Sequence, residues 1–230
     1  MPEKISIVIP TYNEEKYLPG LLRSISCQDY PCEIIVADSS ADKTREIAEE
    51  AGCIVTDGGH IPKARNSGAR IAKHDLLFLD ADTILPDGFL KCFIGRAKEY
   101  GYATCFTKPT TRDLSHSICY SLRGWGSFIV NPFSPHVSGQ CLFVKKELFS
   151  LSGGFDESLY LGEEHELANR LSRHGKGKFF TDMHVMNNPR RLEREGAFQT
   201  LGLDIYSELY RFSVGKVRHR LYERKYGHFS

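Results

Sequence analysis

The chain has 230 residues, of which 41% are hydrophobic and 26% charged, and its formal net charge is +1. This composition is typical of a globular protein with enough apolar material for a buried core, and it excludes a global attraction to nucleic acid. No apolar run approaches the roughly 20 residues that cross a bilayer, and the first residues lack a signal-peptide pattern. The seven cysteines are odd in number, scattered and without a CxxC pair, so we expect reduced thiols in the cytoplasm and no zinc site.

Four apolar runs alternate with helical patterns in the first half of the chain. The runs that indicate strands are ISIVIPTY, EIIVADSS, CIVTDGG and DLLFLDAD. The segments with helical spacing are 14–28, 41–52, 61–74 and 86–101. This alternation predicts an α/β fold with a mostly parallel central sheet flanked by helices, in which ligands bind at the carboxyl ends of the strands. The polar clusters 11–14, 38–42 and 80–82 therefore belong to one edge of the sheet.

The second half is less regular. We expect, in order, a strand at 102–111, a helix or aromatic-rich loop at 114–128, a strand and short helix at 139–153, a helix at 163–175, a strand at 176–187 and a helical remainder. Trp125 lies between two glycines in an aromatic segment. Such a segment forms either an acceptor wall for sugar or lipid or part of the core.

Asp80 and Asp82 follow the fourth apolar run, one residue apart. At a strand end both side chains can reach the same cleft, where carboxylate oxygens suit Mg²⁺ or Mn²⁺. A strand end followed by a turn explains an isolated pair equally well.

Motifs along the chain decide between these interpretations. IPTYNEE, VADSSADKT, KARNSGARIA, LDAD, LSGGFDE and GEEHELANRL follow one another in order. Together they resemble a family 2 glycosyltransferase over roughly residues 4–190. The resemblance implies a Rossmann-like nucleotide-diphospho-sugar transferase fold of GT-A type. It also implies a catalytic domain at 1–200, with a nucleotide-binding half at about 1–100 and an acceptor half at about 101–200, before a basic helical tail at 201–230.

The resemblance assigns a donor-binding role to residues at several motif positions. Asp38 would accept an N–H from the base, and uracil and guanine both offer one, so UDP- and GDP-sugars are both compatible. Arg65 would hold base or phosphate. A turn aspartate and a solvated helix arginine are the alternatives for these two. The residues implied to line the nucleoside pocket are Pro10, Thr11, Tyr12 and Glu14.

The metal and diphosphate positions follow in the same way. Asp80 would face the ribose or hold a water of the metal, and Asp82 would ligate Mn²⁺ or Mg²⁺ at the diphosphate. His184 is a candidate for a further metal ligand, against a structural histidine on a strand. Arg190 and Arg191 would clamp the diphosphate, against two solvated loop arginines.

Glycosyl transfer needs a base that takes the proton of the acceptor hydroxyl. The resemblance implies Glu164 for this role and inversion at the anomeric carbon, with Glu163 as the second candidate. The alternative is a pair of acids that stabilises a helix N-terminus. Asp156, in the GGFDE turn, would bond an acceptor hydroxyl or simply form the turn.

The C-terminal tail is basic, with Val217 on one helical side among charged residues. It would rest on an anionic membrane surface, where lipid-linked acceptors reside, or form a solvated helix packed on the domain. We therefore expect a cytoplasmic protein, with the inner face of the membrane as the alternative location. The basic residues of the tail are Lys216, Arg218, Arg220, Arg224 and Lys225.

The sequence thus predicts an inverting, metal-dependent glycosyltransferase that moves a sugar from UDP or GDP to a hydroxyl of a lipid-linked or polysaccharide acceptor. One alternative is a non-catalytic nucleotide-sugar-binding module. The other is a sugar-phosphate nucleotidyltransferase. Its glycine- and arginine-rich loop is replaced here by TYNEEKY, whose acids would repel a triphosphate.

Overall fold

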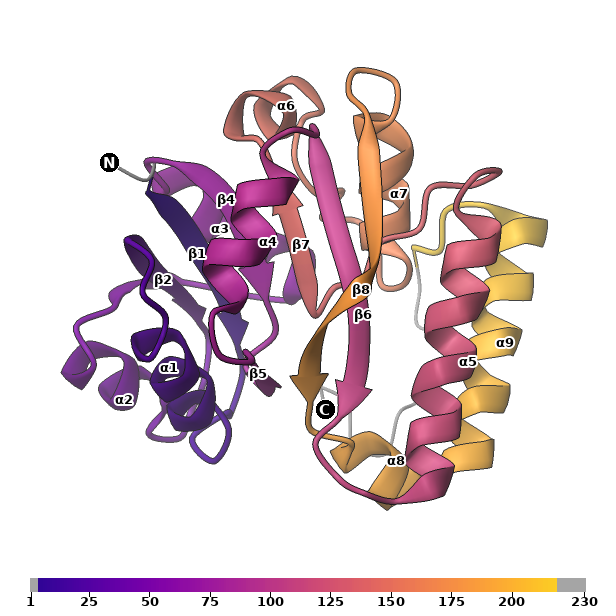
Figure 1. The fold of residues 1–230 in the computed structure, drawn as a ribbon, viewed down its shortest axis with the longest axis horizontal. Helices are drawn as coiled ribbons and strands as arrows, with labels where there is room; N and C mark the ends of the chain where they lie inside the picture. Colours follow the sequence, from indigo (N-terminus) through magenta and orange to yellow (C-terminus); the bar gives the residue numbers. More distant parts are fainter. Residues whose placement is uncertain (1–3, 219–230) are drawn as a thin grey trace.

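The computed structural model describes residues 4–218 (Figure 1). The strands are β1 (Ile5–Thr11), β2 (Cys32–Asp38), β3 (Ile54–Asp57), β4 (Asp75–Leu79), β5 (Thr83–Ile84), β6 (Tyr102–Pro109), β7 (Cys141–Val144) and β8 (Gly177–Asn187). The helices are α1 (Leu18–Ser26), α2 (Thr44–Glu50), α3 (Ile61–Ile71), α4 (Phe89–Ala97), α5 (Leu114–Val130), α6 (Lys146–Leu151), α7 (Glu163–Leu171), α8 (Arg190–Glu195) and α9 (Ala197–Val214).

The strands form one sheet in the order β3-β2-β1-β4-β7-β6-β8-β5. Strands β3, β2, β1 and β4 are parallel, as the repeated strand–helix pattern predicts. Strand β7 is antiparallel to both of its neighbours, β6 and β8 are parallel, and β5 is antiparallel to β8. Four of these seven pairings are parallel, so the expectation of a mostly parallel sheet flanked by helices is confirmed.

The central strands β1 and β4 are mostly apolar on both faces because helices cover both faces of the sheet. Ile7 and Ile9 of β1 pack with α1 and α4 on one face, and Val8 packs with α3 on the other. In β4, Leu77 belongs to the first face and Phe78 to the second. This burial fixes where β1, β2 and β4 end, and therefore which polar residues emerge at the edge of the sheet.

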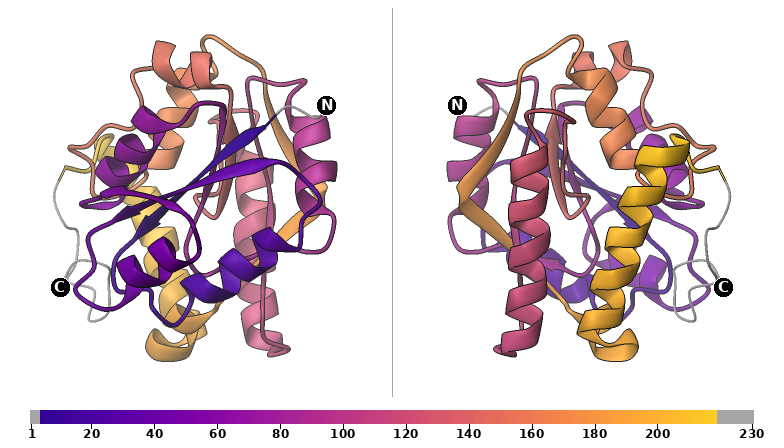
Figure 2. Two further views of the ribbon diagram at one scale, coloured as in Figure 1. Left: turned by 90° about the vertical axis from the view of Figure 1, so that its left-hand side faces the viewer. Right: turned by 90° about the vertical axis from the view of Figure 1, so that its right-hand side faces the viewer.

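Helices α5 and α9 contact each other outside these two layers (Figure 2). The sequence left 114–128 open between helix and loop, and α5 is a helix whose first turn is capped by the carboxylate of Asp113. Tyr120 and Leu192 form a small apolar cluster beneath this pair. The pair therefore lies beside β6, in the half of the chain whose secondary structure was hardest to predict from the sequence.

The chain continues past α9 along the surface of the domain. Val217 is buried and forms an isolated bridge with Leu161, and Nζ of Lys216 lies 2.9 Å from a carboxylate oxygen of Asp156. The tail thus packs on the domain as far as Arg218. The more distal basic residues, Arg220, Arg224 and Lys225, lie outside the described residues.

Two further properties bear on the sequence-based expectations. Within residues 4–218, no helix combines the length and the apolar character that crossing a membrane requires. The seven cysteines, all of which belong to this range, carry free thiols.

Candidate active site

The carboxyl ends of the parallel strands β1 and β2 bring the first polar clusters together. Thr11 Oγ1 donates a hydrogen bond of 2.7 Å to Asp38 Oδ1, and Ser40 Oγ donates one of 2.6 Å to the same oxygen. Asp38 is only 4% exposed. The backbone N–H of Ser40 donates a hydrogen bond of 3.3 Å to the other oxygen, Oδ2, so the carboxylate is held in a fixed orientation. Pro10 and Tyr12 flank Thr11 and are half-buried.

Arg65, on α3, links the end of β4 to the start of α7. Its guanidinium is buried, with Nη2 3.0 Å from Asp80 Oδ1. Nη1 lies 3.1 Å from Glu164 Oε1 and 3.3 Å from Glu163 Oε1. One buried cation thus faces three carboxyl groups from two segments that are distant in sequence. We call these four residues the Arg65 cluster.

The backbone of Gly139 lies directly against Arg65 and Glu164. Its carbonyl oxygen accepts a hydrogen bond of 3.4 Å from Nη2 of Arg65. A Cβ atom at this position would lie 2.3 Å from Glu164 Oε1 and 2.8 Å from Nη2 of Arg65. Only glycine therefore lets the backbone approach this closely. Gly139 was not predicted from the sequence, because no pattern marks a glycine between irregular segments as part of a site.

The two glutamates of α7 differ in charge. Burial and the neighbouring Glu164 raise the pKa of Glu163 to about 8, against the lowering effect of Arg65. Burial would also raise the pKa of Glu164, but the charge of Arg65 and its hydrogen bond to Glu164 bring that pKa below its ordinary value. At neutral pH Glu163 is therefore protonated and Glu164 is a carboxylate.

A second cluster forms around Arg190, at the start of α8. Its guanidinium binds Glu14 in bidentate fashion, at 2.8 and 2.6 Å, and stacks 4.5 Å from the centre of the Tyr17 ring. Nε of Arg190 lies 3.3 Å from Asp82 Oδ2. The two aspartates of the LDAD motif therefore belong to different clusters, Asp80 to that of Arg65 and Asp82 to that of Arg190.

Asp82 is held from its other side by Asn187, the last residue of β8. Nδ2 of Asn187 donates a hydrogen bond of 2.6 Å to Asp82 Oδ1, and the hydroxyl of Tyr120 donates one of 2.7 Å to Asn187 Oδ1. Burial raises the pKa of Tyr120, so the hydroxyl keeps its proton for this bond. The sequence analysis missed both residues. The rule that polar residues at strand ends form sites would have pointed to Asn187, because the strand at 176–187 was predicted.

The aspartate pair fits a hard divalent cation. Its donors are carboxylate oxygens, the ligands that Mg²⁺ and Mn²⁺ prefer, and each carboxylate offers about four lone-pair positions. Among the described residues, His184 does not join Asp80 and Asp82 in a group whose ligand atoms lie within 4.8 Å of one another.

The structure places two other predicted residues away from these clusters. Arg191 pairs with Glu195 at 3.2 Å and with Asp204 of α9 at 3.3 Å, and so points away from Asp82. Asp156 accepts hydrogen bonds from Ser158 and Lys216, which hold its pKa well below the usual range.

The GGFDE turn lines a hollow. Gly153 and Gly154 have φ of 77° and 69°, the left-handed region that glycine tolerates best. The hollow has a volume of about 290 Å³. It is lined by Gly153, Gly154, Phe155, Asp156, Glu166, Arg170 and Lys216.

Comparisons with known proteins establish the family of the chain. Residues 6–129, more than half of the chain, match the Glycosyl transferase family 2 model. The chain belongs to this glycosyltransferase family. Over 101 residues the glycosyltransferase is 34% identical to the poly(ribitol-phosphate) beta-N-acetylglucosaminyltransferase TarS of Staphylococcus aureus, a match that covers 38% of this chain and 18% of TarS. It is 36% identical over 126 residues to the undecaprenyl-phosphate 4-deoxy-4-formamido-L-arabinose transferase of Proteus mirabilis, covering 47% of this chain and 38% of that protein.

Solved structures share the fold of this glycosyltransferase. TarS 1–349 in complex with UDP-GlcNAc matches with a TM-score of 0.63 and 22% identity over 80% of this chain and 58% of that one. The mannosyltransferase PcManGT of Pyrobaculum calidifontis, in complex with GDP-Man and Mn²⁺, matches with a TM-score of 0.62 and 20% identity over 90% of this chain and 65% of that one. The predicted GT-A-type fold is therefore confirmed.

The unequal protonation of Glu163 and Glu164 predicts a pH dependence of stability. Between its ordinary pKa of 4.5 and about 8, Glu163 stays protonated in the folded protein and ionises in the unfolded chain. The folded state then binds more protons, so this group makes stability fall as pH rises. We expect the free energy of unfolding of Glu163→Gln, relative to wild type, to increase from about pH 5 to about pH 8 in urea titrations.

Glu164→Gln provides the matched control. Its carboxylate has a lowered pKa, so it stabilises the folded state above its ordinary pKa of 4.5, and this stabilisation is lost as pH falls. This variant should therefore be less stable than wild type at neutral pH, with the difference shrinking toward acid. The opposite pattern, a flat difference for Glu163→Gln and a growing advantage for Glu164→Gln, would contradict the assignment of charges.

Proposed function

We propose that this protein is an inverting glycosyltransferase that transfers a sugar from a UDP- or GDP-sugar to an acceptor hydroxyl. The observation that carries the proposal is the Arg65 cluster, in which one buried guanidinium contacts Asp80 of the LDAD motif and the Glu163–Glu164 pair. These contacts put a candidate donor-binding carboxylate and a candidate base around the same cation, as single-step transfer between two bound substrates requires.

The donor would bind across the carboxyl ends of β1, β2 and β4. Asp38, fixed by Thr11 and Ser40, is suited to accept the N–H of a uracil or guanine edge. Similar structures hold either donor type, UDP-GlcNAc in TarS and GDP-Man in PcManGT. Arg190 is the cation beside Asp82, and its planar donor fork suits a diphosphate.

Asp82 and Asp80 would hold Mn²⁺ or Mg²⁺, as their oxygen donors allow. When bound, this cation would supply positive charge next to the diphosphate as it leaves. Arg190 would add charge from the protein itself, and its bidentate bond to Glu14 keeps its guanidinium in place when the substrate is absent. His184 and Arg191 have no role in this proposal.

We assign the role of base in the chemical step to Glu164. Its carboxylate takes the proton of the acceptor hydroxyl while the hydroxyl oxygen bonds to the anomeric carbon. The bond between that carbon and the diphosphate oxygen breaks at the same time, and the electron pair leaves with the nucleoside diphosphate. Glu163, neutral at pH 7 and more deeply buried, would orient Arg65 instead of accepting the proton.

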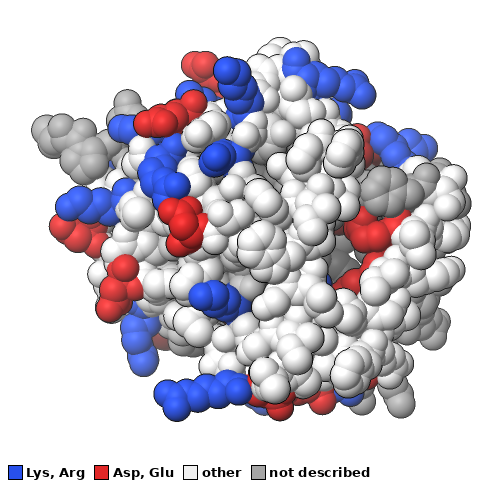
Figure 3. Space-filling model, turned by 45° about the vertical axis from the view of Figure 1, so that its right-hand side comes forward, with Lys and Arg blue, Asp and Glu red and all other residues white. Residues whose placement is uncertain are grey.

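The acceptor would be lipid-linked. Five apolar residues of α5 are exposed at helical spacing on one side: Leu114, Ile118, Leu122, Trp125 and Ile129. Exposed apolar residues of the neighbouring helix α9 extend this surface: Phe198, Ile205, Tyr206 and Leu209. We call these nine residues the apolar face, and a broad part of this side of the molecule carries no charged side chain (Figure 3).

An apolar face of this extent is suited to the boundary between lipid headgroups and acyl chains. The name of the Proteus mirabilis relative, an undecaprenyl-phosphate transferase, supports an acceptor carried on a lipid. The protein would then rest on the membrane surface through α5 and α9, in place of the tail contact that the sequence suggested.

Release of free nucleoside diphosphate from a panel of UDP- and GDP-sugars, with Mn²⁺ present, tests the proposed reaction. We expect turnover in the wild type. Glu164→Gln should lose about 10²- to 10⁴-fold in rate, because it removes the base. Asp82→Ala should lose activity because it removes a ligand of the cation that stabilises the leaving group.

Glu163→Gln is the matched control for the base. A glutamine resembles the protonated glutamate that it replaces, so the loss of rate should be much smaller than in Glu164→Gln. The reverse order would move the base to Glu163. Pyrophosphate release would instead indicate a nucleotidyltransferase, and tight nucleotide binding without turnover would indicate a binding module.

Co-sedimentation with vesicles of anionic phospholipid tests the apolar face. The wild type should bind, and Leu122→Glu should weaken binding at least about tenfold, because it removes an apolar side chain that the membrane would bury and adds a charge at the interface. Leu151→Glu, on α6, is the control: Leu151 is 66% exposed, against 54% for Leu122, and does not belong to the apolar face, so its replacement should leave vesicle binding unchanged. Absence of vesicle binding, or a dimer in light scattering that Leu122→Glu dissociates, would contradict membrane docking.

A further inference from the structure

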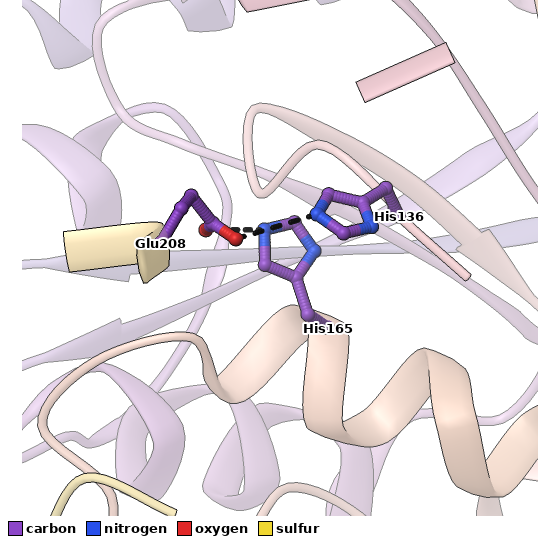
Figure 4. A group of neighbouring side chains, drawn as sticks. All are labelled: His136, His165 and Glu208. Carbon is purple, nitrogen blue, oxygen red and sulfur yellow. Dashed lines mark ion pairs between the residues drawn. The ribbon is translucent and has the colours of Figure 1, made fainter. Parts of the chain in front are cut away.

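Two histidines and a glutamate from three separate elements lie side by side (Figure 4). His136 lies in the segment between α5 and β7, His165 is the third residue of α7, and Glu208 belongs to α9. Nε2 of His136 lies 3.5 Å from Glu208 Oε2, and Nε2 of His165 lies 3.6 Å from Glu208 Oε1. One ligand atom from each residue lies within 4.8 Å of a ligand atom of each of the other two.

His136 is oriented as a metal-bound histidine is. Its Nδ1 lies 2.8 Å from the carbonyl oxygen of Ser134, so Nδ1 carries the proton and Nε2 presents its lone pair to the other two residues. Its backbone N–H donates to Asn131 Oδ1 at 2.9 Å, which fixes the loop that carries it. With only 5% of its side chain exposed, His136 cannot turn to another partner without rearrangement of this loop.

The composition of the group favours Zn²⁺. Two imidazoles and one carboxylate are a ligand set of Zn²⁺ sites that leave the fourth position to water. The two Nε2 atoms approach different oxygens of the Glu208 carboxylate, at 3.5 and 3.6 Å. Donor atoms of all three residues therefore lie around one position, within 4.8 Å of one another.

The two imidazole rings are 4.1 Å apart between centroids, so the histidines are direct neighbours as well as partners of the same carboxylate. Each of the three residues therefore lies next to the other two, as the ligands of one cation do.

We propose that His136, His165 and Glu208 form a binding site for a transition-metal cation, with Zn²⁺ as the preferred ion. The site would fasten α9 to α7 and to the segment before β7, directly beside Glu164, which precedes His165 in the chain. It does not depend on the proposed glycosyl transfer, since it uses none of the residues assigned to donor or cation binding there.

Titration of chelator-treated protein with Zn²⁺ alone, followed by calorimetry, tests this site. The titration is made in the Asp82→Ala variant as well as in the wild type, so that the aspartate pair does not contribute. We expect one Zn²⁺ per chain in both, and a tetrahedral Co²⁺ absorption spectrum when Co²⁺ replaces Zn²⁺. Bound Zn²⁺ should also raise the thermal midpoint of unfolding, because it binds only the folded arrangement of the three residues.

The variants His136→Gln and Glu208→Gln should each weaken Zn²⁺ binding at least about 100-fold. Replacing even a residue that only hydrogen-bonds to a metal ligand lowers metal affinity about 10- to 100-fold. Glu208→Gln changes a partly exposed helix residue and preserves its shape, so it should fold even if His136→Gln does not. His174→Gln, an exposed histidine after α7, is the control and should bind as the wild type does. Absent Zn²⁺ binding, or equal affinity in wild type and Glu208→Gln, would overturn the proposal.

Discussion

The buried guanidinium of Arg65 is the interaction on which the rest of the site depends. Carboxylates from β4 and α7 could not approach one another without a cation, because removing charges from water costs several kcal/mol per ion. Arg65 supplies that cation at 3.0 to 3.3 Å from all three. The group still has more acid than base, and protonation of Glu163 reduces this excess from two negative charges to one. The buried Arg65 thus leaves Glu164 as the charged glutamate of the pair.

The LDAD pair divides its two aspartates between two arginines. Asp80 is tied through Arg65 to the glutamates of the second half, and Asp82 is tied to Arg190 and Asn187 at the ends of later elements. Residues 1–100 therefore do not complete this group of contacts by themselves. Asp82 is bound directly by side chains from the second half of the chain, whereas Asp80 reaches that half through Arg65 of α3.

The sequence alone predicted the first half of the fold well and the second half less well, for a physical reason. The strands β1, β2 and β4 are covered on both faces, so their apolar runs and polar ends are visible as a pattern, and Asp38 and Asp80 follow from it. The position of β7 between β4 and β6 depends on long-range pairing that no local pattern records. Gly139 and the group around Glu208 come from loops and helices that meet only in the folded chain, and their spacing in sequence is too large to suggest contact.

A double-mutant cycle between Arg65 and Asp80 tests whether the buried guanidinium holds the surrounding carboxylates in place. The free energy of unfolding is measured at pH 7 for wild type, Arg65→Met, Asp80→Asn and the double variant. If the buried guanidinium organises the carboxylates, the two changes will be coupled by about 1.5 kcal/mol or more, with Arg65→Met less damaging once Asp80 is neutral. Strictly additive effects would show that Arg65 does not hold Asp80 in place, and would contradict the organising role of the buried guanidinium.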